Sequence, residues 1–196
     1  MAATSGFRIE WTTNVGKLVA MEPQLAEVSA HAGELAAGYN EPENARLMGH
    51  VEPISDTEVV DHYVAMFDEG ARPFLLYLDG KLVGDADLRG MRDGAAEFAF
   101  MIAARDQQGK GLGTKFALMV HAYAFSTLGL VRVYASIMPK NHASRRVFEK
   151  LGYTLDDGAE ARTFADDAGD VTLAIDRATF ERANAAALAQ LRITPQ

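Results

Sequence analysis

The sequence predicts an α/β domain in which helices flank a mixed sheet. Segments of strand and helix character alternate along the 196 residues, and no internal repeat is evident. Three strand-like runs follow one another over residues 73–102, and Asp79-Gly80, a dipeptide typical of hairpins, separates the first two. A strand–helix–strand crossover then spans residues 95–138, which favours a parallel pair of strands. We therefore expect a mostly antiparallel sheet with one central parallel pair.

Two helices are expected before the three strands. The first has apolar residues at helical spacing, with Pro23 suited to its first turn and Gly38 as its end. Residues 39–53 are polar and irregular, which predicts a loop or a broken helix. Ser55 and Glu58 have the spacing of a capping box, so the second helix should open there.

Short strands are expected near both ends of the chain. Residues 7–11 and 17–21 have strand character and could form a hairpin. Residues 130–137 alternate between apolar and polar side chains, as a half-buried strand does. Two further strands are expected at residues 153–155 and 171–175.

A glycine-rich turn lies between the last strand of the meander and a long apolar helix. Gly109, Gly111 and Gly113 alternate with Lys110 and Leu112. The first N–H groups of a helix have no partner within it, and the helix dipole favours an anion there. Glycines also let a bulky diphosphate approach the main chain. The turn therefore predicts a phosphate-binding site, with a flexible loop as the alternative.

Two common phosphate loops do not fit this turn. The pattern GxxxxGK followed by Ser or Thr fails because Ala104 stands at its first glycine and Gly111 follows the lysine. The dinucleotide pattern GxGxxG fails because Thr114 stands at its last glycine. Nucleotide hydrolysis and hydride transfer are both disfavoured.

Composition argues against several other classes. The formal net charge of −8 disfavours sequence-independent binding to nucleic acid or to an anionic membrane. The absence of cysteine excludes disulfides, thiolate zinc sites and a cysteine nucleophile, and the histidines lack metal-ligand spacing. No apolar run reaches the length of a membrane span, and the N-terminus has no secretion-signal pattern. A soluble cytoplasmic protein without a metal is expected.

The glycine turn and a second motif together resemble the GNAT superfamily of acyl-CoA N-acyltransferases. Gln108–Gly113 matches that family's pattern Gln/Arg-x-x-Gly-x-Gly/Ala. The stretch NHASRRVFEKLGYTL, residues 141–155, resembles its second signature, an Asn-led helix ending in Glu-Lys-Leu-Gly and an aromatic residue. The two motifs are separated by one helix and one strand, as in the family. The resemblance covers about residues 70–176 and leans toward the branch of ribosomal-protein N-terminal acetyltransferases.

The resemblance implies a single GNAT-fold domain over residues 1–196, with a sheet that splays between its two central parallel strands. Coenzyme A would lie in the splay, with its pantetheine arm along the first parallel strand and its pyrophosphate on the glycine turn. The coenzyme-binding residues implied are Met101, Ile102, Ala103, Gln108, Gly109, Lys110, Gly111, Leu112, Gly113, Thr114, Asn141, Ser144 and Phe148.

The implied reaction is transfer of an acetyl group from acetyl-CoA to a primary amine by direct attack. The ammonium form of the amine must first lose a proton, so a carboxylate or a water chain near the thioester is needed. Glu97 lies mid-strand on the same face as Met101 and is the first candidate, although it could also be a hydrogen-bonded strand residue. Asp85 and Asp87, on the neighbouring strand, are the second candidates.

The acid that protonates the departing thiolate is less evident. Many family members have a tyrosine seven residues after the signature asparagine, whereas this chain has Phe148 there. A thiol with a pKa of about 8.5 is a fair leaving group without help. Tyr134, Tyr153 and Ser144 are the possible substitutes, and Asn141 with Ser144 completes the catalytic set implied.

The acceptor and the oligomeric state stay open at this point. Glu41, Glu43 and Glu52 lie in the segment expected to line the acceptor's entry, which hints at a cationic small amine or a peptide N-terminus. A non-catalytic acyl-CoA-binding or sensing module and a longer-chain acyltransferase are the alternative functions. Residues 177–196 form an Ala-rich helical extension that could pack on the domain or on a partner, so a homodimer is possible.

Overall fold

One sheet organises the computed structural model, which describes residues 6–49, 52–103 and 105–196. Its strand order among these residues is β7-β8-β6-β5-β4-β3-β2-β1-β9. The strands are β1 (Phe7–Thr13), β2 (Gly16–Met21), β3 (Arg72–Leu78), β4 (Lys81–Arg92), β5 (Ala95–Ile102), β6 (Arg132–Ile137), β7 (Thr154–Leu155), β8 (Val171–Asp176) and β9 (Arg192–Pro195).

The predicted mixture of strand directions is confirmed. Strands β5 and β6 are parallel, and the other described neighbours are antiparallel. The parallel pair follows from the crossover through the long helix after the glycine turn, because that helix returns the chain to the starting edge of β5. The hairpin between β3 and β4 turns at Asp79-Gly80, both with positive φ, as the dipeptide predicted.

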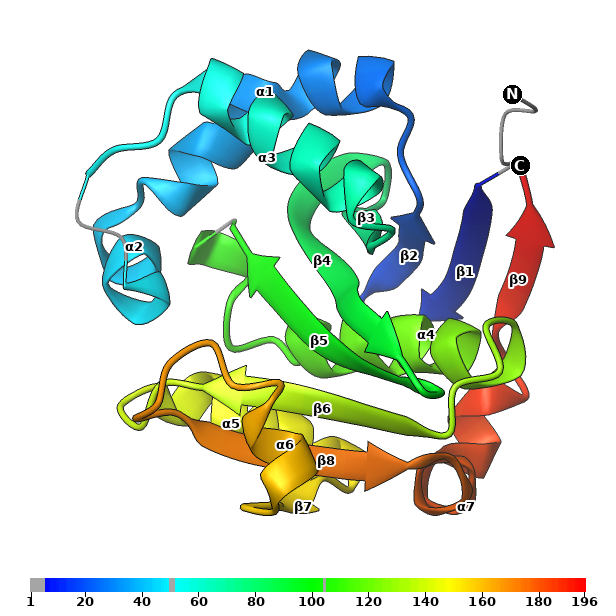
Figure 1. The fold of residues 1–196 in the computed structure, drawn as a ribbon. Helices are drawn as coiled ribbons and strands as arrows, with labels where there is room; N and C mark the ends of the chain where they lie inside the picture. Colours follow the sequence, from blue (N-terminus) through cyan, green and yellow to red (C-terminus); the bar gives the residue numbers. More distant parts are fainter. Residues whose placement is uncertain (1–5, 50–51, 104) are drawn as a thin grey trace.

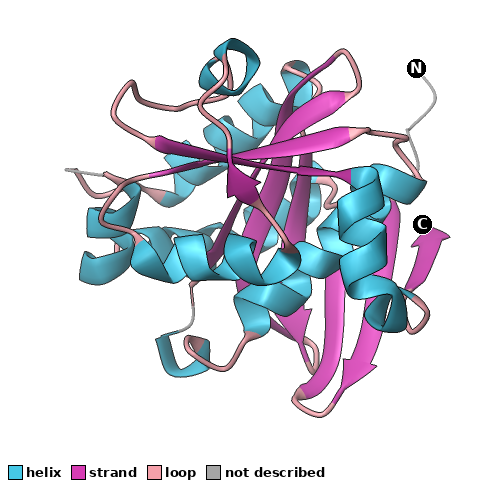
Figure 2. Ribbon diagram, turned by 90° about the horizontal axis from the view of Figure 1, so that it is seen from below, coloured by secondary structure: helices cyan, strands magenta, loops and turns pink. Residues whose placement is uncertain are grey.

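Helices cover both faces of the sheet (Figure 2). One face carries α1 and α3, with α2 beside them at the end of β5 (Figure 1), and the other face carries α4, α5 and α7. The helices are α1 (Leu25–Tyr39), α2 (Pro42–Met48), α3 (Asp56–Asp68), α4 (Leu112–Ser126), α5 (His142–Leu151), α6 (Ala159–Arg162) and α7 (Arg177–Leu188). None of the described helices is long and apolar enough to cross a membrane.

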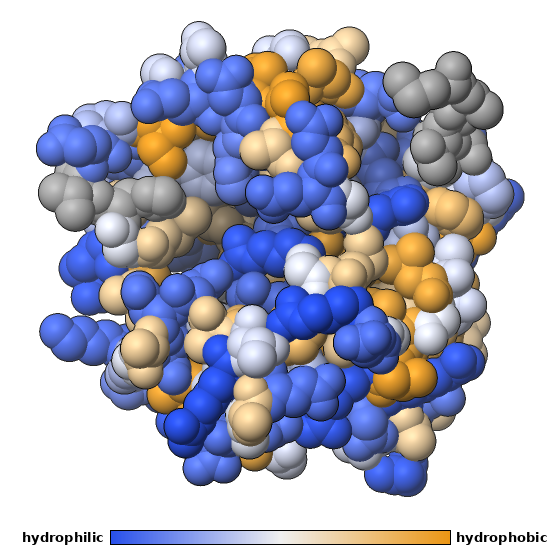
Figure 3. Space-filling view, viewed as in Figure 1, coloured by the Kyte–Doolittle hydropathy of each residue, from blue (hydrophilic) through white to orange (hydrophobic). Residues whose placement is uncertain are grey.

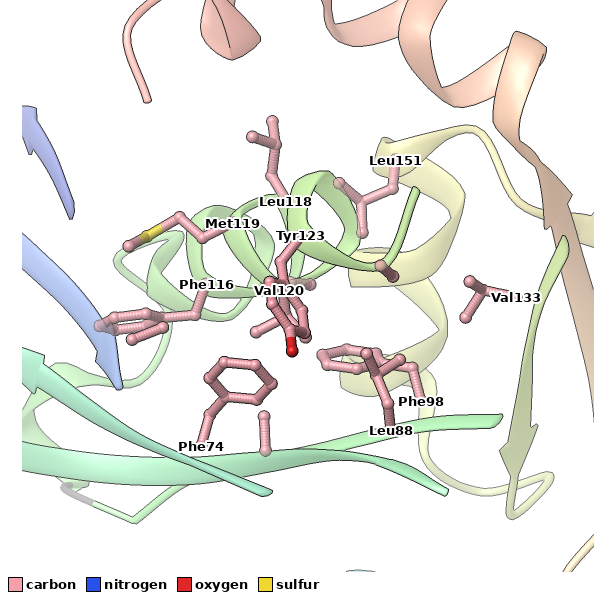
Figure 4. Close-up of a cluster of buried hydrophobic side chains, with 14 of the residues drawn as sticks. Phe74, Leu88, Phe98, Phe116, Leu118, Met119, Val120, Tyr123, Val133 and Leu151 are labelled. Atoms are coloured by element: carbon pink, nitrogen blue, oxygen red, sulfur yellow. The ribbon is translucent and has the colours of Figure 1, made fainter. Parts of the chain in front are cut away.

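Alternation along the strands supplies two cores, one on each face of the sheet. Phe74 and Leu76 on β3 belong to the larger core, whereas Leu75 between them belongs to the core under α1 and α3. In the larger core, Phe116 and Tyr123 of α4 lie over the sheet side chains (Figure 4). The surface leaves some apolar residues exposed, and Figure 3 shows them over α1 and α3 and again at the right of the view. Exposed apolar residues of these two helices are Leu25, Val64 and Phe67.

The feature that positions the site is the divergence of β5 from β6 (Figure 1). The two strands pair only at Ala95–Glu97 with Arg132–Tyr134. Beyond these residues β5 stays paired to β4 as far as Ile102, and β6 stays paired to β8 as far as Ile137. The second halves of β5 and β6 therefore face a gap without a strand between them.

Two segments differ in detail from the sequence expectation. Of the loop and the broken helix expected for residues 39–53, the structure has the broken helix, because residues 42–48 form α2, with Pro42 in its first turn and the Glu41 side chain as its cap. The extension after Asp176 is helical only to Leu188, and its last residues form β9 against β1. The helical part, α7, packs on α4 and α5 of the same domain.

Candidate active site

The glycine turn opens helix α4 with bare main chain. Gly109 and Gly111 have φ values of 75° and 78°, a conformation that glycine adopts more easily than any L-residue. Gly111 is the residue that caps α4, and it has no side chain with which to satisfy the first N–H groups of the helix. These amides, with the positive end of the helix dipole, are available to an anion.

A pocket of about 370 Å³ joins this turn to the end of β5 and to helix α5. Its wall includes most of the coenzyme-binding residues implied by the sequence, but not Ala103, Lys110 or Phe148. The implied residues that line it are Met101, Ile102, Gln108, Gly109, Gly111, Leu112, Gly113, Thr114, Asn141 and Ser144.

Asn141 and Ser144 come together at the start of α5. The Asn141 side-chain oxygen accepts a hydrogen bond from the Ser144 main-chain N–H at 3.0 Å, so Asn141 caps the helix. Both residues also line the pocket, so capping and ligand contact are compatible.

Phe148, which was expected to contact the coenzyme, lies behind the pocket wall. Its side chain is 2% exposed, and its ring packs against Phe98, Phe100 and Tyr153. Of these three, Phe100 lines the pocket. Phe148 thus supports the wall from within the core.

The candidate acids differ in where they lie. Tyr153 is buried and hydrogen-bonded to Nε2 of His121, whose Nδ1 lies 2.6 Å from the Ala117 carbonyl. A carbonyl only accepts, so Nδ1 carries the proton and Tyr153 donates to Nε2; burial lowers the pKa of His121 to about 4. Tyr134 stacks on Phe164 with ring centroids 4.5 Å apart. Ser144, by contrast, lines the pocket.

A part of the wall that the sequence did not indicate comes from α2. Asn44, which is 5% exposed, accepts a hydrogen bond from the Gln108 side chain at 3.0 Å and donates to the Gly38 carbonyl at 2.9 Å. The Gln108 side chain also donates to the Ile102 carbonyl at 2.8 Å. This pair of side-chain amides, of which Asn44 is buried, therefore joins α1, α2, the end of β5 and the glycine turn.

Replacing Asn44 by alanine should loosen the glycine turn. We expect Asn44→Ala to lower stability by about 1–2 kcal/mol, because Gln108 loses a buried partner, and to raise KM for acetyl-CoA severalfold. Asn40→Ala is the matched control. The hydrogen bonds of the Asn40 side chain go to the main chain of Ile54, away from the glycine turn. Thermal unfolding and KM measurements would refute the coupling if both variants changed KM equally.

A row of charged side chains crosses β4 and β5 on the face opposite α4. Asp85, Asp87 and Arg89 alternate along β4, and their register partners on β5 are Met101, Ala99 and Glu97. The Asp85 carboxylate accepts hydrogen bonds from Tyr39 of α1 and from Tyr63 of α3, the latter at 2.9 Å. Burial raises the pKa of Asp85 to about 6.

Glu97, the first candidate for the base, is held in an ion pair. Arg89 donates to both of its carboxylate oxygens at 3.1 Å, and the Glu97 side chain is 9% exposed. Burial raises the pKa of Glu97, and Arg89 opposes that rise. Arg89 also donates a hydrogen bond at 3.2 Å to Asp166, which belongs to the segment that connects β7 to β8 along the chain. No group of three or more His, Asp or Glu side chains among the described residues could hold a metal ion.

The chain is similar in sequence to curated acetyltransferases over part of their length. It is 39% identical over 77 residues to the probable N-acetyltransferase YjcK of Bacillus subtilis, covering 38% of this chain and 42% of that protein. It is 30% identical over 91 residues to the spermidine N(1)-acetyltransferase of Escherichia coli, covering 45% and 48%. The matches thus span less than half the length of these two relatives.

Solved structures share the fold over nearly the whole chain. RimJ of Mycobacterium smegmatis, in complex with CoA-disulfide, superposes with a TM-score of 0.70 at 18% identity, covering 95% of this chain and 96% of that one. The aminoglycoside acetyltransferase AAC(6')-Ib, in complex with coenzyme A, gives 0.69 at 19% identity, covering 90% and 98%. A family model described as an acetyltransferase (GNAT) domain matches residues 25–154. This match, which covers most of the chain, establishes that the protein belongs to the GNAT acetyltransferase family.

Proposed function

We propose that this protein transfers an acetyl group from acetyl-CoA to a primary amine. The observation that carries the proposal is the pocket in which the end of β5, the glycine turn and the start of α5 meet. The pocket combines the start of a helix, which suits the phosphates of the coenzyme, with the part of β5 that does not pair with β6, which suits its thioester arm. The relatives named as spermidine and aminoglycoside acetyltransferases support an amine acceptor.

The coenzyme would bind along this pocket. The N–H groups from Gln108 to Thr114 would hold the pyrophosphate at the start of α4. The pantetheine arm would run along the main chain of β5 between Met101 and Ala103, like an added strand, and would pass Asn141 and Ser144. The thioester would then lie between the diverging strands.

The acceptor would approach from the face covered by α1 and α3. Asp85, Asp87 and Glu97 lie on that face of the sheet, Asp85 and Glu97 buried and Asp87 half-buried, and carboxylates in such surroundings favour a cation. The amine would attack the thioester carbonyl carbon directly. A main-chain N–H near Met101 or Ile102 would stabilise the oxyanion, and the thiolate would leave.

Release of free thiol from acetyl-CoA, measured with a panel of amines, tests the proposal. Spermidine, kanamycin and a peptide with a free N-terminus represent a polyamine, an aminoglycoside and a polypeptide acceptor. We expect turnover with at least one of them and acetylation of its amine by mass spectrometry. Tight binding of acetyl-CoA by calorimetry without turnover on any amine would instead support the sensing module.

A further inference from the structure

We propose that Asp87, rather than Glu97, takes the proton from the acceptor amine. The inference rests on the proposed function and names the catalytic residue of that same site. It comes from three features of β4 and β5: the register of the strands, an unpartnered carboxylate oxygen, and the occupation of the neighbouring carboxylates by other donors.

The register places Asp87 beside the point where the gap opens. Glu97 is the last residue of β5 that pairs with β6, through Tyr134. Ala99 is the next residue of β5 on the same face, and Asp87 is its partner on β4. Ala99 contributes only a methyl group between the Asp87 strand and the gap. A thioester in the gap therefore lies two strand spacings, about 10 Å, from the main chain of β4, and Ala99 is the β5 residue between it and Asp87 on this face.

Asp87 has a carboxylate oxygen, Oδ1, that accepts no hydrogen bond from the described chain. Its Oδ1 is buried without a hydrogen-bond partner, and the side chain is 14% exposed. The Arg89 Nε lies 3.7 Å from this oxygen, which is too far for a hydrogen bond. A buried carboxylate oxygen without a donor costs free energy, so it is expected where a ligand supplies the donor. A primary ammonium supplies N–H donors and a positive charge.

The other two carboxylates of the row are already occupied. Both oxygens of Glu97 accept from Arg89, and Asp85 accepts from Tyr39 and Tyr63. A carboxylate whose lone pairs are held by a guanidinium is a weak proton acceptor. Glu97 thus orients Arg89, and Asp85 is held by the helical layer, which leaves Asp87 free to act.

The surroundings of Asp87 suit a base that works near neutral pH. Burial raises the pKa of Asp87, and Arg89 on the same strand lowers it. The negative charges of Asp85, Glu97 and Asp166 raise it further, and the resulting pKa of Asp87 is about 7. The two hydroxyls that face this cluster from α1 and α3, Tyr39 and Tyr63, have pKa values well above their usual range and stay neutral. A base with a pKa near 7 is partly ionised at neutral pH and still accepts a proton readily.

The proton balance of the step is complete without another reactant. The acceptor ammonium gives one proton to the Asp87 carboxylate and becomes a neutral amine. The amine nitrogen bonds to the thioester carbon, and the carbon–sulfur bond then breaks. A second proton leaves the nitrogen and ends on the coenzyme thiolate, while Asp87 returns its proton to solvent.

The test compares wild type, Asp87→Asn and Glu97→Gln in kcat/KM across pH, with the best amine of the panel. We expect Asp87→Asn to lose at least a hundredfold at pH 7 and to lose the acid limb of the profile, while its calorimetric affinity for acetyl-CoA stays within threefold. Glu97→Gln should lose less and keep an acid limb. Asp68→Asn, the same exchange at an exposed position at the end of α3, is the control for unchanged activity.

A second amine separates proton transfer from a structural role. A fluorinated analogue of the best amine, with a pKa below the assay pH, arrives already neutral and does not need the base. The ratio of wild-type to Asp87→Asn rates should therefore fall at least tenfold with this analogue. Equal ratios for the two amines, or an Asp87→Asn rate within threefold of wild type, would overturn the assignment alone. A wild type inactive on every amine would overturn the proposed function and the assignment together.

Discussion

Replacing Gly109 and Gly111 together by alanine should weaken acetyl-CoA binding at least tenfold. Both residues have φ near +75°, where alanine is less stable than glycine by about 1–2 kcal/mol. Without the coenzyme, the turn of the variant can leave this conformation and relieve the strain. Binding the coenzyme would require the turn to return to it. Since about 1.4 kcal/mol corresponds to a factor of ten, two strained residues account for the expected loss in a calorimetric Kd.

A matched pair of glycines separates binding from stability. Gly70 and Gly129 follow α3 and α4, have φ values of 76° and 71°, and would place an added methyl group in open space, as Gly109 would. The double variant Gly70→Ala/Gly129→Ala should therefore carry the same kind of backbone strain in the folded protein and keep its affinity for acetyl-CoA. If the two double variants bound the coenzyme equally well, the glycine turn would not be the pyrophosphate site.

Asp87→Asn should make the protein more stable at pH 8 while it removes activity. The folded structure raises the pKa of Asp87 from 3.8 to about 7. Between these values the native state holds a proton that the unfolded chain does not. The stability contributed by this protonation is complete below pH 4 and is lost as pH rises through 7. Asparagine does not titrate, so the variant escapes this loss.

The stability advantage of Asp87→Asn over wild type should therefore grow with pH. Relative to pH 4, it should increase by at most about 4 kcal/mol at pH 8, because each pKa unit corresponds to about 1.4 kcal/mol. Urea unfolding at the two pH values measures it, with Asp68→Asn expected to show no such change. An advantage that stayed constant or shrank with pH would contradict the raised pKa of Asp87 in the folded protein.

Local patterns were sufficient to predict the elements that line the pocket. The crossover after β5, the glycine turn and the Asn-led α5 each depend on residues within a few positions of one another. The sequence left a loop and a broken helix open for the segment that contains α2, because the seven residues of α2 bury only Asn44, and that residue is satisfied by Gln108 from far along the chain. Strand β9 was missed because only its pairing with β1, at the other end of the chain, makes four residues a strand.

The sequence predicted three candidate carboxylates for the base that deprotonates the amine, but it could not select one of them, and the charged row on β4 and β5 shows why. Alternation placed Asp85 and Asp87 on a common face, as the structure does. A regular hairpin at Asp93-Gly94 would pair Glu97 with Gly90, but the register shifts between Arg89 and Arg92. The shift brings Arg89 opposite Glu97 and forms the ion pair. Because a register shift has no local sequence signal here, the occupation of Glu97 could not be predicted.

The account depends on a diphosphate-bearing coenzyme lying on the glycine turn with its thioester between β5 and β6. A crystal structure with coenzyme A bound measures this directly. We predict diphosphate oxygens within hydrogen-bonding distance of main-chain N–H groups between residues 108 and 114, and the sulfur in the gap beside Ala99. A diphosphate bound elsewhere, or a sulfur outside the gap, would contradict the account.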